Sequence, residues 1–373
     1  MNVTISDIRI AGYSDHNRWN DYVMAHKNGF VYHLFEWKKA IEAAYGFDCP
    51  YFILAHKNRI RGIMPTAHIR SPFGRGRLVS QPYCDVGGAL TDDPEMADVL
   101  FEYACQYARQ SRINEIEIRH TPEISTRSEC HNSCNDEKMS SSESLEPSVT
   151  GKVRMLLDLP KNSEELLSSF KSKLRSQIRK PSRDGLTAVL GGMEMLTEFY
   201  TVFTENMRDL GSPTHSMKWL DSVFKHFGEK AKCGMVYMPD KTPAAGGIIL
   251  CYKNVVSVPW ASSVFRLKRF NPNMLLYWTF LKFAADNGYR FFDFGRSTPN
   301  EGTYKFKAQW GAKSQPLIWR KWKIGRNGAH SAIAVSTLHS NSRIRPMAEK
   351  VIQHTPLPLA TFLGSRIRKY ISL

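Results

Sequence analysis

The sequence lacks the segments that would place it in a membrane or outside the cell. No uninterrupted apolar run approaches the length of about 20 residues that a membrane-spanning helix needs. The first residues, Met1 to Arg9, do not have the basic and then apolar pattern of a signal peptide. The seven cysteines are odd in number and scattered, unlike a disulfide framework. These absences together predict a cytoplasmic protein in a reducing compartment.

Several catalytic signatures are also missing. The sequence has no strained nucleophile turn, no glycine-rich nucleotide-binding loop, no zinc-protease motif and no cysteine–histidine signature. Cys130, His131 and Cys134 supply too few well-spaced ligands for zinc, so we expect no metal. Attack of an amine on a bound thioester or ester is compatible with these absences. That reaction needs positioning, a proton acceptor and a donor to the carbonyl oxygen, but no protein nucleophile.

Acidic residues are scarce relative to basic ones. The 51 Lys and Arg residues exceed the 35 Asp and Glu residues, which gives a formal net charge of +16. Such an excess indicates either a polyanionic partner or an anionic membrane surface, or it serves only solubility. Charge alone does not decide between these readings.

One order of elements is present twice. Each half reads as helix, helix, hairpin, strand, helix and strand, because helical and alternating apolar spacings follow one another in the same sequence. In the first half these elements fall at 15–25, 35–45, 51–69, 78–90, 95–110 and 115–119, and in the second at 193–210, 216–227, 233–252, 254–263, 272–288 and 290–294. The strand–helix–strand step predicts a parallel crossover. We therefore expect an α/β (α+β) fold of two similar domains with mixed central sheets.

The composition suggests where these domains end. We predict a first domain at 1–120, a Ser-rich disordered insertion at 121–151, a second domain at 152–325 and a basic tail at 326–373. Within the tail, the stretch from Leu359 to Tyr370 mixes apolar and basic residues as in an amphipathic helix. It either docks on the body of the protein, which we favour, or lies on an anionic membrane at its inner face.

Two basic segments could hold phosphate groups. Between Ser163 and Pro181, Arg175 and Arg179 lie beside an apolar stripe on a predicted helix. The alternative is a solvated helix face. The connection from Arg266 to Asn273 is also basic and leads into a helix N-terminus, which favours an anion, although it has no glycine.

The segment from Asp293 to Gly311 is the best site candidate. Arg296 and Ser297 follow a strand at its C-terminal edge, where ligands bind in α/β sheets. Residues 304–307 alternate aromatic and lysine side chains, so we expect a strand on which Lys305 and Lys307 point to the same side. The alternative is an edge strand whose lysines only face water.

These residues resemble a known family. The stretches from Leu157 to Lys180, F-D-F-G-R-S at 292–297 and G-T-Y-K-F-K-A-Q-W-G at 302–311 are similar to tandem GNAT-type acyltransferases, as in the Fem peptidoglycan aminoacyltransferases. With Q-P-Y-C-D-V-G-G at 81–88, N-M-R-D-L-G-S-P at 206–213 and V-P-W-A-S-S at 258–263, they resemble the FemAB-related proteins of exosortase-linked polysaccharide gene clusters. The resemblance covers about 1–325 without the insertion.

The resemblance implies a tandem GNAT acyl-CoA N-acyltransferase fold with a cleft between or beside the domains. In Fem enzymes the donor is an aminoacyl-tRNA and the acceptor a peptidoglycan precursor. This sequence shows no helical arm of the kind that some Fem enzymes use near tRNA. We therefore expect acyl-coenzyme A as co-substrate, with tRNA as the less favoured alternative, and no permanent cofactor. The expected acceptor is an amine of a small molecule or polysaccharide precursor of the cell envelope.

The residue roles follow from this expectation. In an N-acyltransferase, Asp293 would accept a proton and Lys307 would stabilise negative charge. Phosphate or carboxylate groups would be held by Arg175, Arg179, Arg208, Arg296 and Ser297, and the acceptor pocket lined by Trp260, Tyr277, Tyr304, Lys305 and Trp310. The alternative function is a non-catalytic protein that binds a polyanion or polysaccharide on a degenerate transferase fold.

Overall fold

A computed structural model describes residues 4–71, 74–120, 149–325, 330–333 and 344–372. Most of the predicted insertion, with Cys130, His131 and Cys134, lies outside this range. Its predicted C-terminal limit at 151 overlaps a strand that begins at Val149. Among the described residues, no helix is long and apolar enough to cross a membrane.

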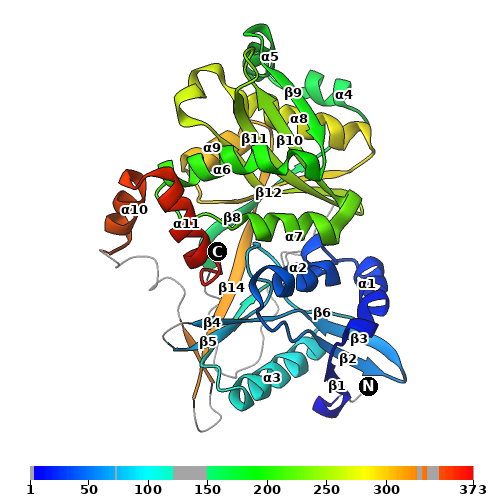
Figure 1. Ribbon diagram of the computed structural model, residues 1–373. Helices are drawn as coiled ribbons and strands as arrows, with labels where there is room; N and C mark the ends of the chain where they lie inside the picture. Colours follow the sequence, from blue (N-terminus) through cyan, green and yellow to red (C-terminus); the bar gives the residue numbers. More distant parts are fainter. Residues whose placement is uncertain (1–3, 72–73, 121–148, 326–329, 334–343, 373) are drawn as a thin grey trace.

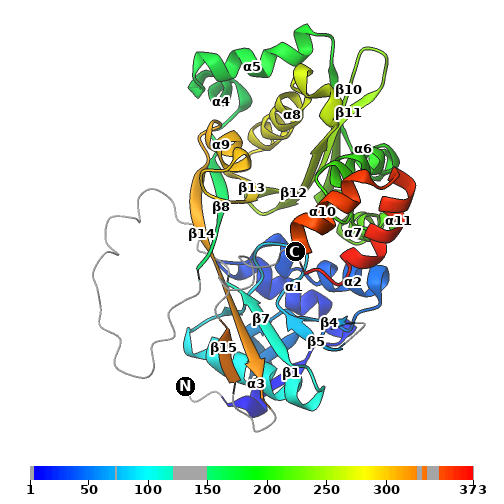
Figure 2. The ribbon, with the colours of Figure 1, turned by 90° about the vertical axis from the view of Figure 1, so that its left-hand side faces the viewer.

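The first half has the predicted helices and crossover. Its elements are β1 (Ile8–Ile10), α1 (His16–Ala25), α2 (Phe35–Tyr45), β2 (Phe52–His56), β3 (Arg59–Met64), β4 (Ala67–Ser71), β5 (Gly74–Val79), β6 (Leu90–Thr91), α3 (Glu95–Gln110) and β7 (Glu115–Arg119). β1, β2, β3 and β6 form a small sheet in that order with β2 and β3 central, whereas β5 and β7 pair in parallel within a larger sheet. Helix α3 makes the crossover between β5 and β7 (Figures 1 and 2).

The second half repeats this arrangement and extends it. Its elements are β8 (Val149–Asp158), α4 (Ser163–Ser169), α5 (Ser172–Arg183), β9 (Thr187–Gly191), α6 (Leu196–Asp209), α7 (Met217–Phe227), β10 (Ala231–Tyr237), β11 (Pro243–Tyr252), β12 (Val255–Ser263), α8 (Pro272–Asp286), β13 (Phe291–Ser297), α9 (Gly302–Ala308), β14 (Lys313–Ile324) and β15 (His330–Ile333). β12 and β13 are parallel, and α8 joins them. The predicted strand–helix–strand step is thus present in both halves.

One strand belongs to both halves. β14 pairs with β8 through Lys313 to Ile318 and with β7 through Trp319 to Lys323. The large sheet therefore runs without interruption in the order β4-β5-β7-β14-β8-β13-β12-β11-β10-β9, with β15 on β14. In Figures 1 and 2, β14 extends from one half of the molecule into the other. The predicted domains thus share one sheet, which a boundary drawn from composition could not reveal.

The halves also meet through a packed aromatic core. Helices α2 and α7 pack together. Trp37 on α2 stacks on Trp260 at 6.4 Å and meets Trp219 on α7 edge to face at 5.2 Å. Burial of such large side chains is the dominant stabilising contribution at an interface of this kind.

Three local expectations are wrong. The strand predicted at 78–90 is absent over most of its length, because β5 ends at Val79, β6 begins at Leu90, and the backbone between them forms bends and turns. The helix predicted from 163 to 181 is interrupted, because Phe170 has extended backbone angles between α4 and α5. The strand predicted over residues 304–307 is helix α9. The alternation Tyr-Lys-Phe-Lys spans only four residues, and the longer spacing of Phe306 and Trp310, which lie four residues apart and face inward, is helical.

The C-terminal segment forms α10 (Ile344–His354) and α11 (Leu357–Arg368), and both helices contact α6. They lie at the outer edge of the molecule in Figures 1 and 2. Gly364 of α11 allows close approach, because a Cβ there would lie 3.0 Å from the Thr214 nitrogen. The segment is thus docked on the second half.

Candidate functional site

The parallel strands β12 and β13 separate part-way along their length. Their pairing ends at Ser257 and Asp293, although β12 continues to Ser263 and β13 to Ser297. On its other side β13 shifts register against β8 between Asp293 and Arg296. Gly295 lies in this irregularity with a φ of +71°, a conformation that side chains with a Cβ rarely adopt. The sheet is therefore open at the point where the sequence predicted a site.

Lys307 reaches this opening from α9. Its Nζ donates to the carbonyl oxygen of Arg296 at 2.7 Å and to that of Gly295 at 3.2 Å. The side chain is buried, and burial lowers the pKa of Lys307 to about 8, although the charges of Asp85 and Asp293 oppose this change. Lys307 is thus a buried ammonium that is still mostly protonated at neutral pH, with one N–H beyond the two used by the carbonyls.

Asp85 enters the same place from the first half. Its Oδ2 accepts from the Arg296 backbone N–H at 3.0 Å, and its Oδ1 lies 3.7 Å from Nε of Arg296. Its carbonyl oxygen accepts from Nε1 of Trp319 at 2.9 Å. Asp85 lies in the motif at 81–88, and no role was predicted for it from the sequence. An acidic residue in a loop that follows a parallel strand was the signal available.

Asp293 is held by an ion pair that the sequence analysis missed. Nε of Arg154 on β8 lies 3.0 Å from Oδ2 of Asp293, and the Gly295 N–H donates to Oδ1 at 2.9 Å. Both side chains are buried, and the Arg154 guanidinium lies 4.4 Å from the Phe30 ring centroid. The charge of Asp293 is thus already neutralised by Arg154. This geometry does not favour it as a free proton acceptor.

Several buried polar atoms around the opening have no hydrogen-bond partner among the described residues. They are Nη1 and Nη2 of Arg154, beyond the Nε that is ion-paired with Asp293, and the hydroxyls of Ser257 and Ser297. Buried polar groups are normally hydrogen-bonded. The opening is therefore rich in polar groups that a bound molecule could contact, and Ser297 remains a predicted ligand contact.

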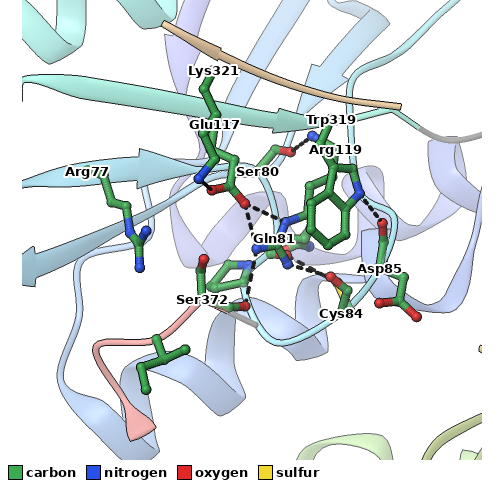
Figure 3. A network of polar contacts seen from close by, with 12 residues as sticks. Arg77, Ser80, Gln81, Cys84, Asp85, Glu117, Arg119, Trp319, Lys321 and Ser372 are labelled. Carbon is green, nitrogen blue, oxygen red and sulfur yellow. Dashed lines mark hydrogen bonds and ion pairs between the residues drawn. The ribbon is translucent and has the colours of Figure 1, made fainter. Parts of the chain in front are cut away.

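The corresponding place in the first half is closed by the chain itself (Figure 3). Glu117 pairs with Val79 as Asp293 pairs with Ser257. Burial opposes ionisation of Glu117, but the charges of Arg119 and Lys321, at 2.6 and 3.1 Å, outweigh it and hold its pKa at about 2.

Arg119 connects its ion-pair partner Glu117 to distant parts of the chain. It is fully buried and donates to the carbonyl oxygens of Gln81, Cys84 and Ser372 (Figure 3). Carbonyl groups of the chain satisfy this guanidinium, in contrast to Arg154. The first half therefore has a structural network where the second half has an opening.

The other predicted anion-binding arginines lie elsewhere. Arg175 and Arg179 are on α5, and Arg208, near the end of α6, pairs with Asp209 at 2.7 Å. Arg179 lines a pocket of about 370 Å³ together with Arg183 and Trp278. The structure thus brings only Arg296 and Ser297 of the five predicted anion-binding residues to the opening between β12 and β13.

The predicted acceptor pocket does not form as a group. Trp260 is packed at the interface of the halves, Tyr277 stacks on Phe294 at 5.5 Å, and Trp310 is 1% exposed against Phe170. These three aromatic residues are core side chains. Tyr304 is half-buried, and Lys305 is exposed on α9, whereas Lys307 is buried. Lys305 and Lys307 therefore do not share a side, since residues two apart on a helix do not face each other.

The basic connection before α8 is a short 3₁₀ helix, Phe265–Phe270. Asn271 follows with a φ of +54° and leads directly into the first turn of α8, which has Pro272 at its start. Asparagine tolerates this left-handed conformation, so the bend into α8 forms without a glycine. Arg266, Lys268 and Arg269 thus lie just before a helix N-terminus.

Comparison with known proteins assigns the second half. Residues 168–308 match the family model described as the acetyltransferase (GNAT) domain. This region is a GNAT domain. It contains β12, α8, β13 and α9, and therefore Lys307 and the opening between the parallel strands. No curated protein sequence matches the chain.

Solved structures are similar over most of the chain. FemX is 15% identical with a TM-score of 0.63, and the match covers 86% of this chain and 98% of FemX. A conserved protein of unknown function from Bacteroides thetaiotaomicron VPI-5482 is 8% identical with a TM-score of 0.50, covering 85% and 99%. A tandem GNAT protein from the clavulanic acid biosynthesis pathway is 10% identical with a TM-score of 0.49, covering 85% and 98%.

These likenesses concern the fold. The family match and the FemX likeness confirm the expected tandem GNAT-type α/β fold. The exosortase-linked subgroup stays a prediction. Among the described residues, no group of side chains is suited to hold a metal ion.

Proposed function

We propose that this protein is an N-acyltransferase whose reacting groups meet at the opening between β12 and β13. The observation that carries this proposal is the buried ammonium of Lys307, which lies in a GNAT domain beside Asp85 from the other half. A strongly perturbed pKa at a break in a sheet is characteristic of functional sites.

Lys307 and Asp85 have separate roles in the proposed reaction. When the acceptor amine attacks the acyl carbon, a C–N bond forms and negative charge develops on the carbonyl oxygen. The free N–H of Lys307 stabilises this charge. Asp85 is partly exposed and takes the proton that the amine loses, replacing Asp293 in that role because Asp293 is bound to Arg154. The carbon–sulfur bond then breaks, and the leaving thiolate takes the proton from Asp85 and departs as the thiol.

The donor we propose is an acyl-coenzyme A. Its phosphates would lie at the N-terminus of α8, next to Arg266, Lys268 and Arg269, where free N–H groups and the helix dipole favour an anion. Aminoacyl-tRNA is the competing donor, because the resemblance to Fem enzymes extends to FemX in the structural comparison. The acceptor we propose is an amine of a polysaccharide precursor, which rests on the sequence resemblance.

Thiol release from acetyl-coenzyme A in the presence of a panel of amines, including amino sugars, tests this proposal. We expect amine-dependent release together with a rise in the unfolding temperature on adding acetyl-coenzyme A, because a ligand that binds only the native state stabilises it. An unrelated nucleotide serves as control. If transfer is seen only from aminoacyl-tRNA, the proposed donor is wrong, but the proposed reaction, transfer of an acyl group to an amine, is kept. Binding of polyanions without any transfer would instead support the non-catalytic alternative.

A further inference from the structure

Helix α11 presents its apolar residues to solvent. Leu359, Phe362, Leu363 and Ile367 are each about half exposed, at spacings of three and four residues that place them on one side of the helix. The opposite side carries the small residue Gly364, which is buried against Thr214. An amphipathic helix on a protein surface normally buries its apolar stripe, so α11 is oriented the other way.

Helix α10, next to α11 in Figures 1 and 2, also exposes apolar residues. Met347 and Val351 are four residues apart and are 71% and 62% exposed. Among the described residues, six of the thirteen exposed large apolar side chains lie on these two adjacent helices. Such a concentration marks an interaction site, whereas single exposed apolar residues are ordinary.

The charges on these two helices are mostly basic. The chain from Leu357 onward contains Arg366, Arg368 and Lys369 and no acidic residue. Arg366 is exposed, and its guanidinium lies 4.1 Å from the Phe362 ring centroid. Lys350 is exposed on α10, where Glu349 is the single acid. Apolar side chains with adjacent cations match the acyl boundary and headgroups of an anionic bilayer.

We propose that the outer face of α10 and α11, formed by Met347, Val351, Leu359, Phe362, Leu363 and Ile367, binds the surface of an anionic lipid membrane. The apolar side chains enter the headgroup region, and Arg366 and Lys350 contact lipid phosphates. The helices stay docked on α6 through their inner face, so binding needs no rearrangement of the fold.

This surface is joined to the proposed active site. The chain after α11 places the Lys369 carbonyl 2.6 Å from the Tyr83 hydroxyl and the Ser372 carbonyl 2.7 Å from the Tyr83 N–H. Tyr83 is two residues from Asp85. A membrane on α11 would therefore be coupled by hydrogen bonds to the loop that carries Asp85.

Co-sedimentation of the full chain with lipid vesicles tests the proposal, without any donor or acceptor. We expect binding to vesicles of phosphatidylcholine and phosphatidylglycerol, little binding to phosphatidylcholine alone, and weakening at high salt. Phe362→Ser with Leu363→Ser should reduce partitioning by about tenfold or more, since two large apolar side chains no longer leave water.

Two controls make the result decisive. Met24→Ser removes a similarly exposed apolar side chain on α1 and should bind as the unaltered protein does. Both variants should keep their unfolding temperature, because exposed substitutions away from special features have small effects. The proposal is overturned if vesicles do not bind, or if the Phe362 and Leu363 variant binds normally through net charge alone. It is also overturned if ultracentrifugation shows that this face instead joins two copies of the chain.

Discussion

Replacement of Lys307 by Met should abolish most turnover without weakening the fold. The pKa of Lys307 falls from 10.5 to about 8, which corresponds to about 3 kcal/mol of preference for the neutral side chain. Met removes this unfavourable charge and keeps the stem. Its cost is the loss of the bonds to the Gly295 and Arg296 carbonyls, about 1 kcal/mol each. We therefore expect equal or slightly greater stability at neutral pH.

The catalytic effect should be large by comparison. Loss of a donor to a developing oxyanion lowers the rate by about a hundredfold or more. Turnover of the unaltered enzyme should fall as pH rises through about 8, since the acting form of Lys307 is protonated. Stability should change in the opposite direction, because the folded-state pKa lies below the unfolded value. The unaltered protein should gain stability from about pH 8 to above pH 10, and the Met variant should not.

The assay is thiol release at saturating donor, combined with thermal unfolding across this pH range. Lys305→Met is the matched control, because Lys305 is exposed on the same helix. It should retain turnover within a few-fold. Near-normal turnover by a folded Lys307→Met variant would refute the catalytic assignment. A marked loss of stability would instead show that the bonds from Lys307 to the 295–296 carbonyls hold the turn.

Three further outcomes follow from the buried and exposed arginines. Arg154→Met should destabilise the protein by about 3–5 kcal/mol in urea unfolding, since it leaves Asp293 buried and unpaired. Adding Asp293→Asn should restore part of this free energy. A double variant that is as unstable as Arg154→Met, or less stable, would contradict this explanation. Arg119→Met should lower the free energy of unfolding by a similar amount and speed hydrogen exchange of the amides near Ser372. Unchanged exchange would show that the C-terminal segment is held in place without Arg119. Arg269→Glu should weaken donor binding at low salt with no change in unfolding temperature, because Arg269 is exposed just before the N-terminus of α8, where we place the donor phosphates. Unchanged affinity would leave that segment as solvated surface.

The order of elements and the repeated crossover were accessible from the sequence. Apolar spacing along a single segment encodes helices and strands locally, so α3 and α8, together with β7, β12 and β13, were predicted near their observed positions. The same spacing indicated the amphipathic helix α11. Apolar spacing gave the wrong prediction for α9. The alternation of four residues suggested a strand, and only a longer segment that includes Trp310 shows the helical spacing.

Only some residues of the site could be predicted from local sequence patterns. The sequence indicated Lys307, Arg296 and Asp293, because polar residues after a buried strand mark the edge of a sheet. It could not show that Asp293 is neutralised by Arg154, since the two lie on strands that are far apart in the chain and pair only in the folded sheet. A partner in an ion pair has no local pattern.

Only the tertiary structure joined the two halves at one place. Asp85 meets Arg296 because β14 links the halves into one sheet and the Tyr83 loop is fixed by the C-terminal segment. The sequence likewise predicted an amphipathic α11 but not which side it would bury. That choice depends on the close approach of Gly364 to Thr214, a contact between residues distant in sequence, and it leaves the apolar stripe facing solvent.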